Sequence, residues 1–278
     1  MQLELGISPC PNDTWIFFAL ANKKIDMPFD ITMYMADVED LNIRARKGDI
    51  SATKLSVAAM TDCLDDYILL RTGGALGRGC GPIVVTKQDT CFQSAREADK
   101  KVAIPGKLTT ANMLLSLNNS LKGERVEMLF DQVMPAVQSG AVDAGVVIHE
   151  GRFTYENFGL KKVLDLGQWW ENTTNLPLPL GAIAIRRDLG MEKARQLEKA
   201  IRASLSYVQQ HPEEATAYIK EHAQEMDDAV IKEHIATFVN EFSMELGADG
   251  EYAIQLLLEK AFELAGKPMP DLPVFVTD

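Results

Sequence analysis

The first third of the chain alternates short apolar stretches with longer stretches of helical periodicity. Four apolar stretches have the length of β-strands, and they are residues 2–7, 31–35, 50–53 and 67–70. Helical spacing appears at residues 12–21 and 38–47, and the second stretch ends at Gly48, a residue type that commonly closes a helix. Strands that alternate with helices of about ten residues predict a mostly parallel sheet.

A second series of the same kind follows a glycine-rich stretch at residues 73–81. Its expected strands are residues 101–104, 126–130 and 144–148, and residues 82–86 and 181–185 are expected strands on either side of it. One expected helix opens at Thr109 and Thr110 and runs to about residue 118, and another covers residues 132–139. The strand at 144–148 is a continuous apolar run, which is typical of a buried strand.

The last third has the pattern of four helices, at residues 191–210, 212–222, 227–242 and 250–265. Helices without strands of their own need a sheet to pack on, and the nearest is that of the N-terminal part. The sequence therefore predicts a large α/β lobe of residues 1–86 plus 181–278, and an inserted smaller α/β lobe of residues 87–180. Two α/β lobes joined by two crossings predict a hinged clamshell that binds its ligand in the cleft between the lobes.

Composition changes this picture mainly by exclusion. The net charge of -12 and the pI near 4.9 argue against nucleic-acid binding, although a helix N-terminus can still bind a small anion. The sequence has neither a signal-peptide pattern nor an apolar run of about 18 residues, so we expect no membrane insertion and a cytoplasmic location. Cys10, Cys63, Cys80 and Cys91 form no Cys-x-x-Cys pair, so we expect neither a disulfide framework nor a metal site.

Thr109 and Thr110 follow a strand and a Pro-Gly turn, where a helix is expected to begin. The N–H groups of a first helical turn, together with two hydroxyl groups, suit a carboxylate or a phosphate. N-capping is the alternative, because threonine is a common cap. Capping would use only one of the two threonines, so we favour a role in ligand binding.

Lys54, Leu55 and Ser56 occupy the corresponding strand-to-helix turn of the other lobe. Ser56 could donate a hydrogen bond to a ligand, and Lys54 could offset its charge. A capped helix beside a solvated lysine explains this segment alone equally well.

His149 directly follows the expected buried strand at 144–148. A histidine at the carboxyl end of a strand is well placed to act as a base, because imidazole titrates near physiological pH. The alternative is a histidine held by hydrogen bonds at a sheet edge. His211 lies at a helix end and His222 and His234 lie on charged helix faces, so we expect all three at the surface. We therefore favour His149 as a general base.

Cys10, Asn12 and Arg78 are further candidates for lining the cleft. Cys10 lies between two prolines, and packing explains it better than a nucleophilic role. Arg78 lies in the glycine-rich stretch, which has neither the Lys-Ser/Thr ending of a P-loop nor a Gly-x-Gly-x-x-Gly motif entering a helix. We expect that stretch to line the cleft or to flank the hinge, where Arg78 could contact an acid group.

Five segments are more specific together than any single motif. They are residues 8–14 (Ser-Pro-Cys-Pro-Asn-Asp-Thr), 53–56 (Thr-Lys-Leu-Ser), 73–79 (Gly-Gly-Ala-Leu-Gly-Arg-Gly), 148–150 (Ile-His-Glu) with 152–154 (Arg-Phe-Thr), and 176–181 (Leu-Pro-Leu-Pro-Leu-Gly). In these segments the chain resembles the 1,4-dihydroxy-6-naphthoate synthase family, whose enzymes act in the futalosine route to menaquinone. The resemblance extends from about residue 3 into the helical tail.

The resemblance implies a two-lobed periplasmic-binding-protein-like (type II) fold. It also implies a carbon–carbon lyase that converts cyclic dehypoxanthine futalosine to 1,4-dihydroxy-6-naphthoate and dihydroxyacetone without a metal or an organic cofactor. The family's general base corresponds to His149, and its substrate-binding segments correspond to Lys54-Leu55-Ser56 and Thr109-Thr110. The implied partner is a small carboxylate substrate. The segment that holds its carboxylate and the oligomeric state stay open.

Two other functions fit the same fold. A non-catalytic small-anion solute-binding protein would be expected to carry a secretion signal or a lipid anchor. A chorismate dehydratase of the same pathway would not be expected to contain the Ile-His-Glu segment at residues 148–150. A regulator's effector domain would need a DNA-binding module in addition, and the two expected lobes account for all the residues.

Overall fold

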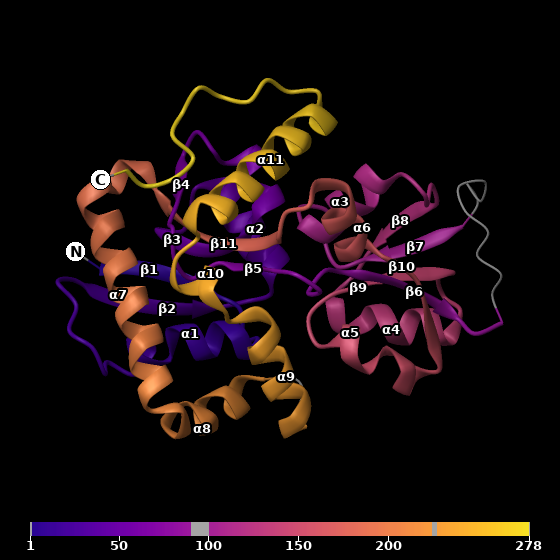
Figure 1. Ribbon diagram of the computed structural model, residues 1–278, viewed down its shortest axis with the longest axis horizontal. Coiled ribbons are helices and arrows are strands. Elements are labelled where there is room, and N and C mark those ends of the chain that lie inside the picture. The colour runs from indigo at the N-terminus through magenta and orange to yellow at the C-terminus, as the bar shows by residue number, and fades with distance from the viewer. Residues whose placement is uncertain (1, 90–99, 224–226, 278) are drawn as a thin grey trace. The chain divides into compact units, whose positions relative to one another are not determined.

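The computed structural model describes residues 2–89, 100–223 and 227–277, so Cys91 lies outside the described residues. The chain forms two compact units, namely unit 1 of Met1–Gly77 with Pro179–Asp278 and unit 2 of Arg78–Leu178. Each unit has its own sheet (Figure 1). The sequence suggested a first crossing near residue 86. The strand expected there pairs with strands of the second sheet, and the chain enters unit 2 at Arg78.

Unit 1 is built on a six-stranded sheet in the order β2-β1-β3-β11-β4, with β5 paired to β11. Its strands are β1 Gln2–Ile7, β2 Asp30–Met35, β3 Ala52–Ser56, β4 Tyr67–Leu69, β5 Ala75–Gly77 and β11 Leu178–Arg186. As expected, β1 is parallel to both β2 and β3, whereas β11 runs antiparallel to β3 and β4. The carboxyl ends of β1, β2 and β3 therefore lie at one edge of the sheet.

The helices of unit 1 are α1 Pro11–Ala21, α2 Val38–Lys47, α7 Met191–Gln210, α8 Pro212–His222, α9 Asp228–Phe238, α10 Glu241–Met244 and α11 Gly247–Ala265, with 3₁₀ turns η1 Val57–Asp62 and η3 Arg187–Leu189. Helix α2 ends at Gly48 in the αL conformation, as its sequence predicts. Helix α1 is buried on almost every side, because α7, α8 and α9 pack around it (Figure 1). The late helices thus pack on the N-terminal part of the chain.

The helix expected over residues 227–242 is interrupted. Asn240 is the N-cap of α10, with its side chain accepting a hydrogen bond from the N–H of Phe242 at 3.0 Å. Its side-chain amide also donates to the carbonyl oxygen of Leu76 at 2.8 Å. Asparagine competes with helical backbone hydrogen bonds in this way, so one predicted helix becomes two.

Unit 2 is built on a five-stranded sheet in the order β10-β6-β9-β7-β8. Its elements are β6 Ile83–Lys87, β7 Lys101–Ile104, α3 Thr110–Asn118, β8 Glu124–Glu127, α4 Phe130–Ser139, β9 Ala144–Val147, α5 Gly151–Thr154, η2 Tyr155–Phe158, β10 Leu160–Asp165 and α6 Leu166–Thr174. Strand β9 is central and fully buried, and it is parallel to β7, which is parallel to β8. Strands β6 and β10 are antiparallel additions.

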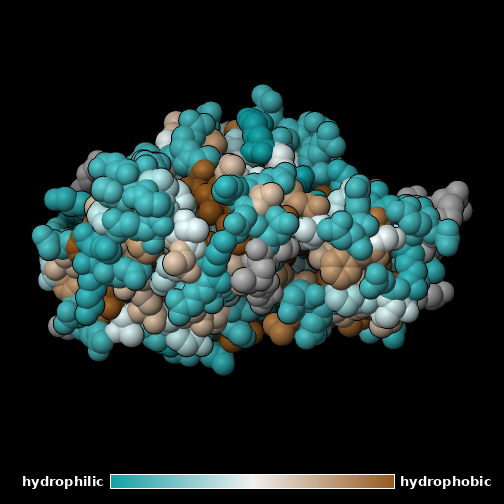
Figure 2. Space-filling model, turned by 90° about the horizontal axis from the view of Figure 1, so that it is seen from below, coloured by the Kyte–Doolittle hydropathy of each residue, from teal (hydrophilic) through white to brown (hydrophobic). Residues whose placement is uncertain are grey.

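Hydrophilic side chains cover most of the face shown in Figure 2, and apolar side chains occur there in small patches. Two of the exposed large apolar residues of the described chain, Tyr252 and Leu264, lie in α11, and the others are Tyr34, Leu129, Val163 and Leu272. Among the residues that the structure describes, no helix combines the length and the apolar character needed to cross a bilayer.

Candidate active site

In unit 2, two groups of candidate residues follow neighbouring strands. Thr109 and Thr110 come after β7, and His149 comes after β9. The two strands are parallel partners, with Val102 opposite Ala144. Because the carboxyl ends of adjacent parallel strands lie at the same sheet edge, the threonines and His149 belong to one edge of unit 2.

Thr109 is the N-cap of α3. Its hydroxyl oxygen accepts a hydrogen bond from the N–H of Asn112 at 3.2 Å. The same hydroxyl group donates a hydrogen bond to the carbonyl oxygen of Gly106 at 2.7 Å. N-capping, the alternative to ligand binding that the sequence left open, therefore accounts for Thr109. Thr110 is the first residue of α3 and is equally buried.

The capping role predicts a measurable loss of stability. We expect Thr109→Ala to lower the free energy of unfolding by about 1 kcal/mol, because the hydroxyl group no longer satisfies the first turn of α3. Thr109→Ser keeps the hydroxyl group and serves as the control. Urea unfolding measures both variants, and equal stability of Thr109→Ala and wild type would show that this cap is dispensable.

His149 has an unusual backbone conformation, with φ of 55° in the αL region. The other non-glycine residues with positive φ in the described chain are Lys23, Asn119 and Asn175, which follow the ends of helices α1, α3 and α6. His149 instead lies between β9 and α5, where no helix end requires this conformation. Sparsely populated backbone conformations cluster at functional sites, and this one presents an imidazole at a sheet edge.

The ring of His149 packs against Phe130, the first residue of α4. The two ring centroids lie 4.8 Å apart with an interplanar angle of 71°, an edge-to-face contact. Phe130 follows β8, whose carboxyl end lies at the same edge of the sheet. This contact restricts the orientation of the imidazole, and the spacing of the two residues in the sequence contains no signal for it.

In unit 1, the carboxylate of Asp13 is the centre of a buried polar network. Its Oδ2 atom accepts hydrogen bonds from the backbone N–H of Ser8 at 3.1 Å and from the Ser8 hydroxyl at 2.8 Å. Its Oδ1 atom accepts from Asn12 Nδ2 at 2.9 Å and from Lys54 Nζ at 2.7 Å. The Asp13 and Lys54 side chains are only 1% and 6% exposed, so this is a buried ion pair with additional donors.

The ion pair changes the interpretation of Lys54. The sequence suggested a lysine that offsets the charge of a bound anion, but the structure shows an ammonium group already neutralised by Asp13. Lys54 also lies within β3 rather than in a turn after it. A ligand at this edge would meet a neutral pair with directed hydrogen bonds rather than an unpaired positive charge.

Leu55 and Ser56 complete β3. Leu55 is fully buried in the core and lies opposite Ala182 of β11. Asn42 of α2 holds Ser56 twice: its Oδ1 atom accepts from the Ser56 N–H at 2.8 Å, and its Nδ2 atom donates to the Ser56 hydroxyl oxygen at 3.1 Å. Helix α2 therefore fixes the end of β3, and sequence reasoning missed this contact between Asn42 and the candidate segment.

Gly181 on β11 lies opposite Ser56 and leaves space for the Lys54 side chain. An added Cβ atom would lie 2.8 Å from Lys54 Cε and 3.1 Å from the carbonyl oxygen of Leu55. We expect Gly181→Ala to displace the Lys54 stem and to cost about 1–3 kcal/mol of stability, as overpacking does. Thermal unfolding together with steady-state kinetics tests this, and unchanged stability and KM would mean that Lys54 needs no such space.

The remaining lining candidates have different positions. Cys10 is the buried N-cap of α1, and Asn12 is buried in the first turn of the same helix. Arg78 is exposed, and its guanidinium donates to the carbonyl oxygen of Asn175 at 2.9 Å within unit 2. The C-terminal end of α6 therefore holds Arg78, whereas Cys10 and Asn12 are buried in unit 1.

The expected surface position of His234 is wrong. The ring is completely buried, and its Nε2 atom lies 2.9 Å from Asn12 Oδ1. Helix α9 has charged residues on its outer side, which suggested an exposed helix, but its inner side packs on α1. Such a contact between residues 222 positions apart leaves no local signal in the sequence.

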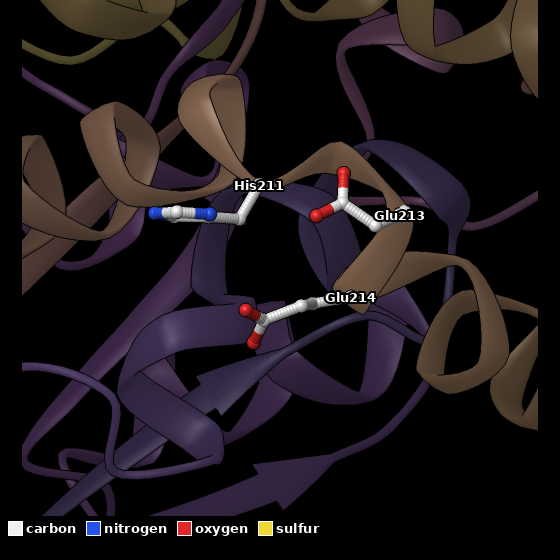
Figure 3. Close-up of side chains that lie close together, drawn as sticks. All are labelled: His211, Glu213 and Glu214. Carbon is white, nitrogen blue, oxygen red and sulfur yellow. The ribbon is translucent and has the colours of Figure 1, made fainter.

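One side-chain cluster has ligand types that metals accept. His211, Glu213 and Glu214 lie at the start of α8 with one possible ligand atom each within 4.8 Å (Figure 3). Glu214 already forms an ion pair with Lys24 at 2.9 Å, and hydrogen bonds from Lys24 and Tyr207 hold the pKa of its carboxyl group below the usual value. The cluster is a partly exposed ion-paired helix start, and we assign no metal to it.

The sequence profile of a family described as menaquinone biosynthesis matches residues 3–263. A curated protein of Thermus thermophilus, named 1,4-dihydroxy-6-naphthoate synthase, is 48% identical over 275 residues, which are 99% of each chain.

Solved structures agree on the fold. A crystal structure of a protein from Archaeoglobus fulgidus is 35% identical and has a TM-score of 0.87 over 95% of this chain and 98% of its own. The periplasmic aliphatic sulphonate binding protein of Escherichia coli is 12% identical and has a TM-score of 0.66 over 96% of this chain and 89% of its own. The expected α/β, periplasmic-binding-protein-like fold is confirmed.

Proposed function

Because the chain belongs to the menaquinone biosynthesis family, we propose that it converts cyclic dehypoxanthine futalosine to 1,4-dihydroxy-6-naphthoate and dihydroxyacetone, as a carbon–carbon lyase. The observation that carries this proposal is the 48% identity, over 99% of both chains, with the Thermus thermophilus protein named 1,4-dihydroxy-6-naphthoate synthase. A match of this extent includes both groups of candidate residues. The expected family is confirmed by the same match.

We propose His149 as the general base. Three observations support this role: its position after the central strand β9, its αL backbone, and the ring of Phe130 against its imidazole. A base must be held in one orientation to reach one proton, and the packing of Phe130 contributes to that.

The proposed step is a retro-aldol cleavage. An imidazole nitrogen of His149 accepts the proton of a substrate hydroxyl group or of an acidified carbon. When the hydroxyl proton is taken, the O–H electron pair forms a carbonyl group as the adjacent carbon–carbon bond breaks. The electron pair of that bond passes into the fragment that becomes the naphthoate ring. Aromatisation of this fragment favours cleavage, and a positioned base typically contributes about 10²–10⁴-fold to the rate.

We propose that Lys54, Leu55 and Ser56 of unit 1 form one substrate-binding segment and that Thr109 and Thr110 of unit 2 form another. In unit 1 the hydrogen-bond donors are the Lys54 ammonium group, which Asp13 holds, and the Ser56 hydroxyl group, which Asn42 holds. In unit 2 the first turn of α3 offers a helix N-terminus, with Thr110 as its first residue. One of these two places binds the substrate carboxylate.

The enzyme reaction is tested directly against its alternatives. Purified protein is incubated separately with cyclic dehypoxanthine futalosine and with chorismate, and the products are separated and identified. We expect naphthoate and dihydroxyacetone in equal amounts from the first substrate and unchanged chorismate from the second. Dehydration of chorismate would support the dehydratase instead. Bound but unaltered cyclic dehypoxanthine futalosine would support a solute-binding protein.

We place the enzyme in the cytoplasm, where a biosynthetic lyase encounters a nucleoside-derived substrate. Cell fractionation with an antibody against the chain tests this location. Recovery of the protein in the periplasmic fraction would overturn it.

A further inference from the structure

His234 is a buried titratable side chain that the proposed reaction does not use. It lies in α9, near the end of the chain, and its side chain is inaccessible to solvent. Its Nε2 atom lies 2.9 Å from Oδ1 of Asn12 in the first turn of α1. Burying a polar ring costs free energy unless the ring forms a hydrogen bond. The bond to Asn12 therefore offsets part of the cost of burying His234.

The orientation of the Asn12 amide determines which atom of His234 carries a proton. Asn12 Nδ2 donates to Oδ1 of Asp13 at 2.9 Å, so the amide oxygen of Asn12 must face His234. The opposite orientation would place the amide oxygen against the Asp13 carboxylate, an acceptor against an acceptor. His234 Nε2 therefore donates a hydrogen bond to Asn12.

The same chain of hydrogen bonds continues to β3. Asn12 holds Oδ1 of Asp13, and that oxygen also accepts from Lys54 Nζ at 2.7 Å. The bonds run from His234 through Asn12 and Asp13 to Lys54, and all four residues are buried. In a site of low polarity, each of these bonds is stronger than it would be in water, and each depends on the orientation of the next.

We propose that His234 is a positioning residue for the substrate-binding segment of unit 1, acting on Lys54 through Asn12 and Asp13. This inference rests on the proposed function, in which Lys54 contacts the substrate. His234 itself does not contact the reacting atoms. It fixes the Asn12 amide, which in turn fixes the carboxylate that holds the Lys54 ammonium group.

A purely structural role for the ring is the alternative. His234 also packs on Phe238, one turn further along α9, with ring centroids 4.7 Å apart. If packing were its whole purpose, an apolar side chain of similar volume would replace it without an effect on substrate binding. A side chain that preserves the donor but not the ring would then be the worse replacement. The two roles predict opposite orders for the same pair of variants.

The test compares His234→Leu with His234→Gln. Glutamine places an amide N–H near the position of Nε2 and preserves the donor, whereas leucine preserves apolar volume and removes the donor. We expect His234→Leu to raise KM for cyclic dehypoxanthine futalosine at least tenfold with kcat changed less than threefold. We expect His234→Gln to restore KM to within threefold of wild type. His222→Leu, at a partly exposed histidine of α8, is the matched control with unchanged kinetics.

A double variant shows whether the effect passes through Lys54. In a Lys54→Met background, His234→Leu is expected to change KM less than twofold, because the group that it positions is already absent. A full tenfold effect in that background would overturn the proposal. Better retention of KM in His234→Leu than in His234→Gln would overturn it as well and would assign the ring to packing.

A spectroscopic measurement on the wild-type protein does not depend on activity. Protein labelled with ¹⁵N-histidine is expected to show a protonated Nε2 for His234, assigned by its loss in His234→Gln. An unprotonated Nε2 would overturn the positioning role alone. Failure of the wild-type protein to form naphthoate would overturn the proposed function, so the two failures are distinguishable.

Discussion

Replacing His149 with asparagine is expected to lower kcat at least a hundredfold while the dissociation constant for the substrate changes little. The imidazole supplies the base, and a positioned base contributes about 10²–10⁴-fold. Asparagine is the suitable replacement because it tolerates the αL conformation that His149 adopts. The loss then reports on the missing base rather than on backbone strain. Stopped-flow kinetics and titration calorimetry measure the two quantities.

Two further variants separate the chemistry from local folding. His149→Ala also removes the base but places alanine at a positive φ, so it is expected to match the asparagine variant in kcat and to be less stable. His211→Asn changes a histidine at the start of α8 and is expected to keep wild-type turnover. Near-normal turnover in both His149 variants would remove this residue from the role of base.

Replacing Asp13 with asparagine is expected to produce the largest loss of stability, about 3–5 kcal/mol, because it leaves a buried ammonium group without its counter-ion. The Asp13 carboxylate accepts four hydrogen bonds, and Lys54 Nζ is one of the donors. Activity is expected to fall as well, because Lys54 loses its position. Urea unfolding monitored by circular dichroism measures the stability.

The matched control is Asp49→Asn. Asp49 pairs with Arg44 at 2.9 Å but is half exposed, so its removal is expected to cost less than about 1 kcal/mol. The double variant Asp13→Asn with Lys54→Met should be more stable than Asp13→Asn alone, because no uncompensated charge stays buried. Equal losses in Asp13→Asn and Asp49→Asn would show that the buried pair has no special role.

The sequence was sufficient to predict those helices and strands whose formation depends mainly on their own residues. Helix α2 ends at Gly48 as predicted, because glycine closes a helix wherever its surroundings permit. Strand β9 was recognisable as an apolar run with His149 shortly after it. The candidate segments of both units also lie near the carboxyl ends of strands, as the alternation of strands and helices predicted.

Tertiary contacts decided the features that sequence reasoning missed. Strand β10 is an edge strand with the consecutive lysines Lys161 and Lys162, which suit an edge but hide the pattern of a strand. Asp13 was not among the candidate residues, because its ion pair with Lys54 joins residues 41 positions apart. His234 was misplaced for the same reason, because its partner Asn12 lies at the other end of the chain.

A conversion assay with a catalytic amount of protein tests the proposed reaction most directly. Cyclic dehypoxanthine futalosine in large molar excess is incubated with the wild-type protein, and naphthoate and dihydroxyacetone are quantified over time. We expect many equivalents of both products per protein, in a ratio of one to one. Recovery of the substrate unchanged, with at most one equivalent bound per protein, would contradict it.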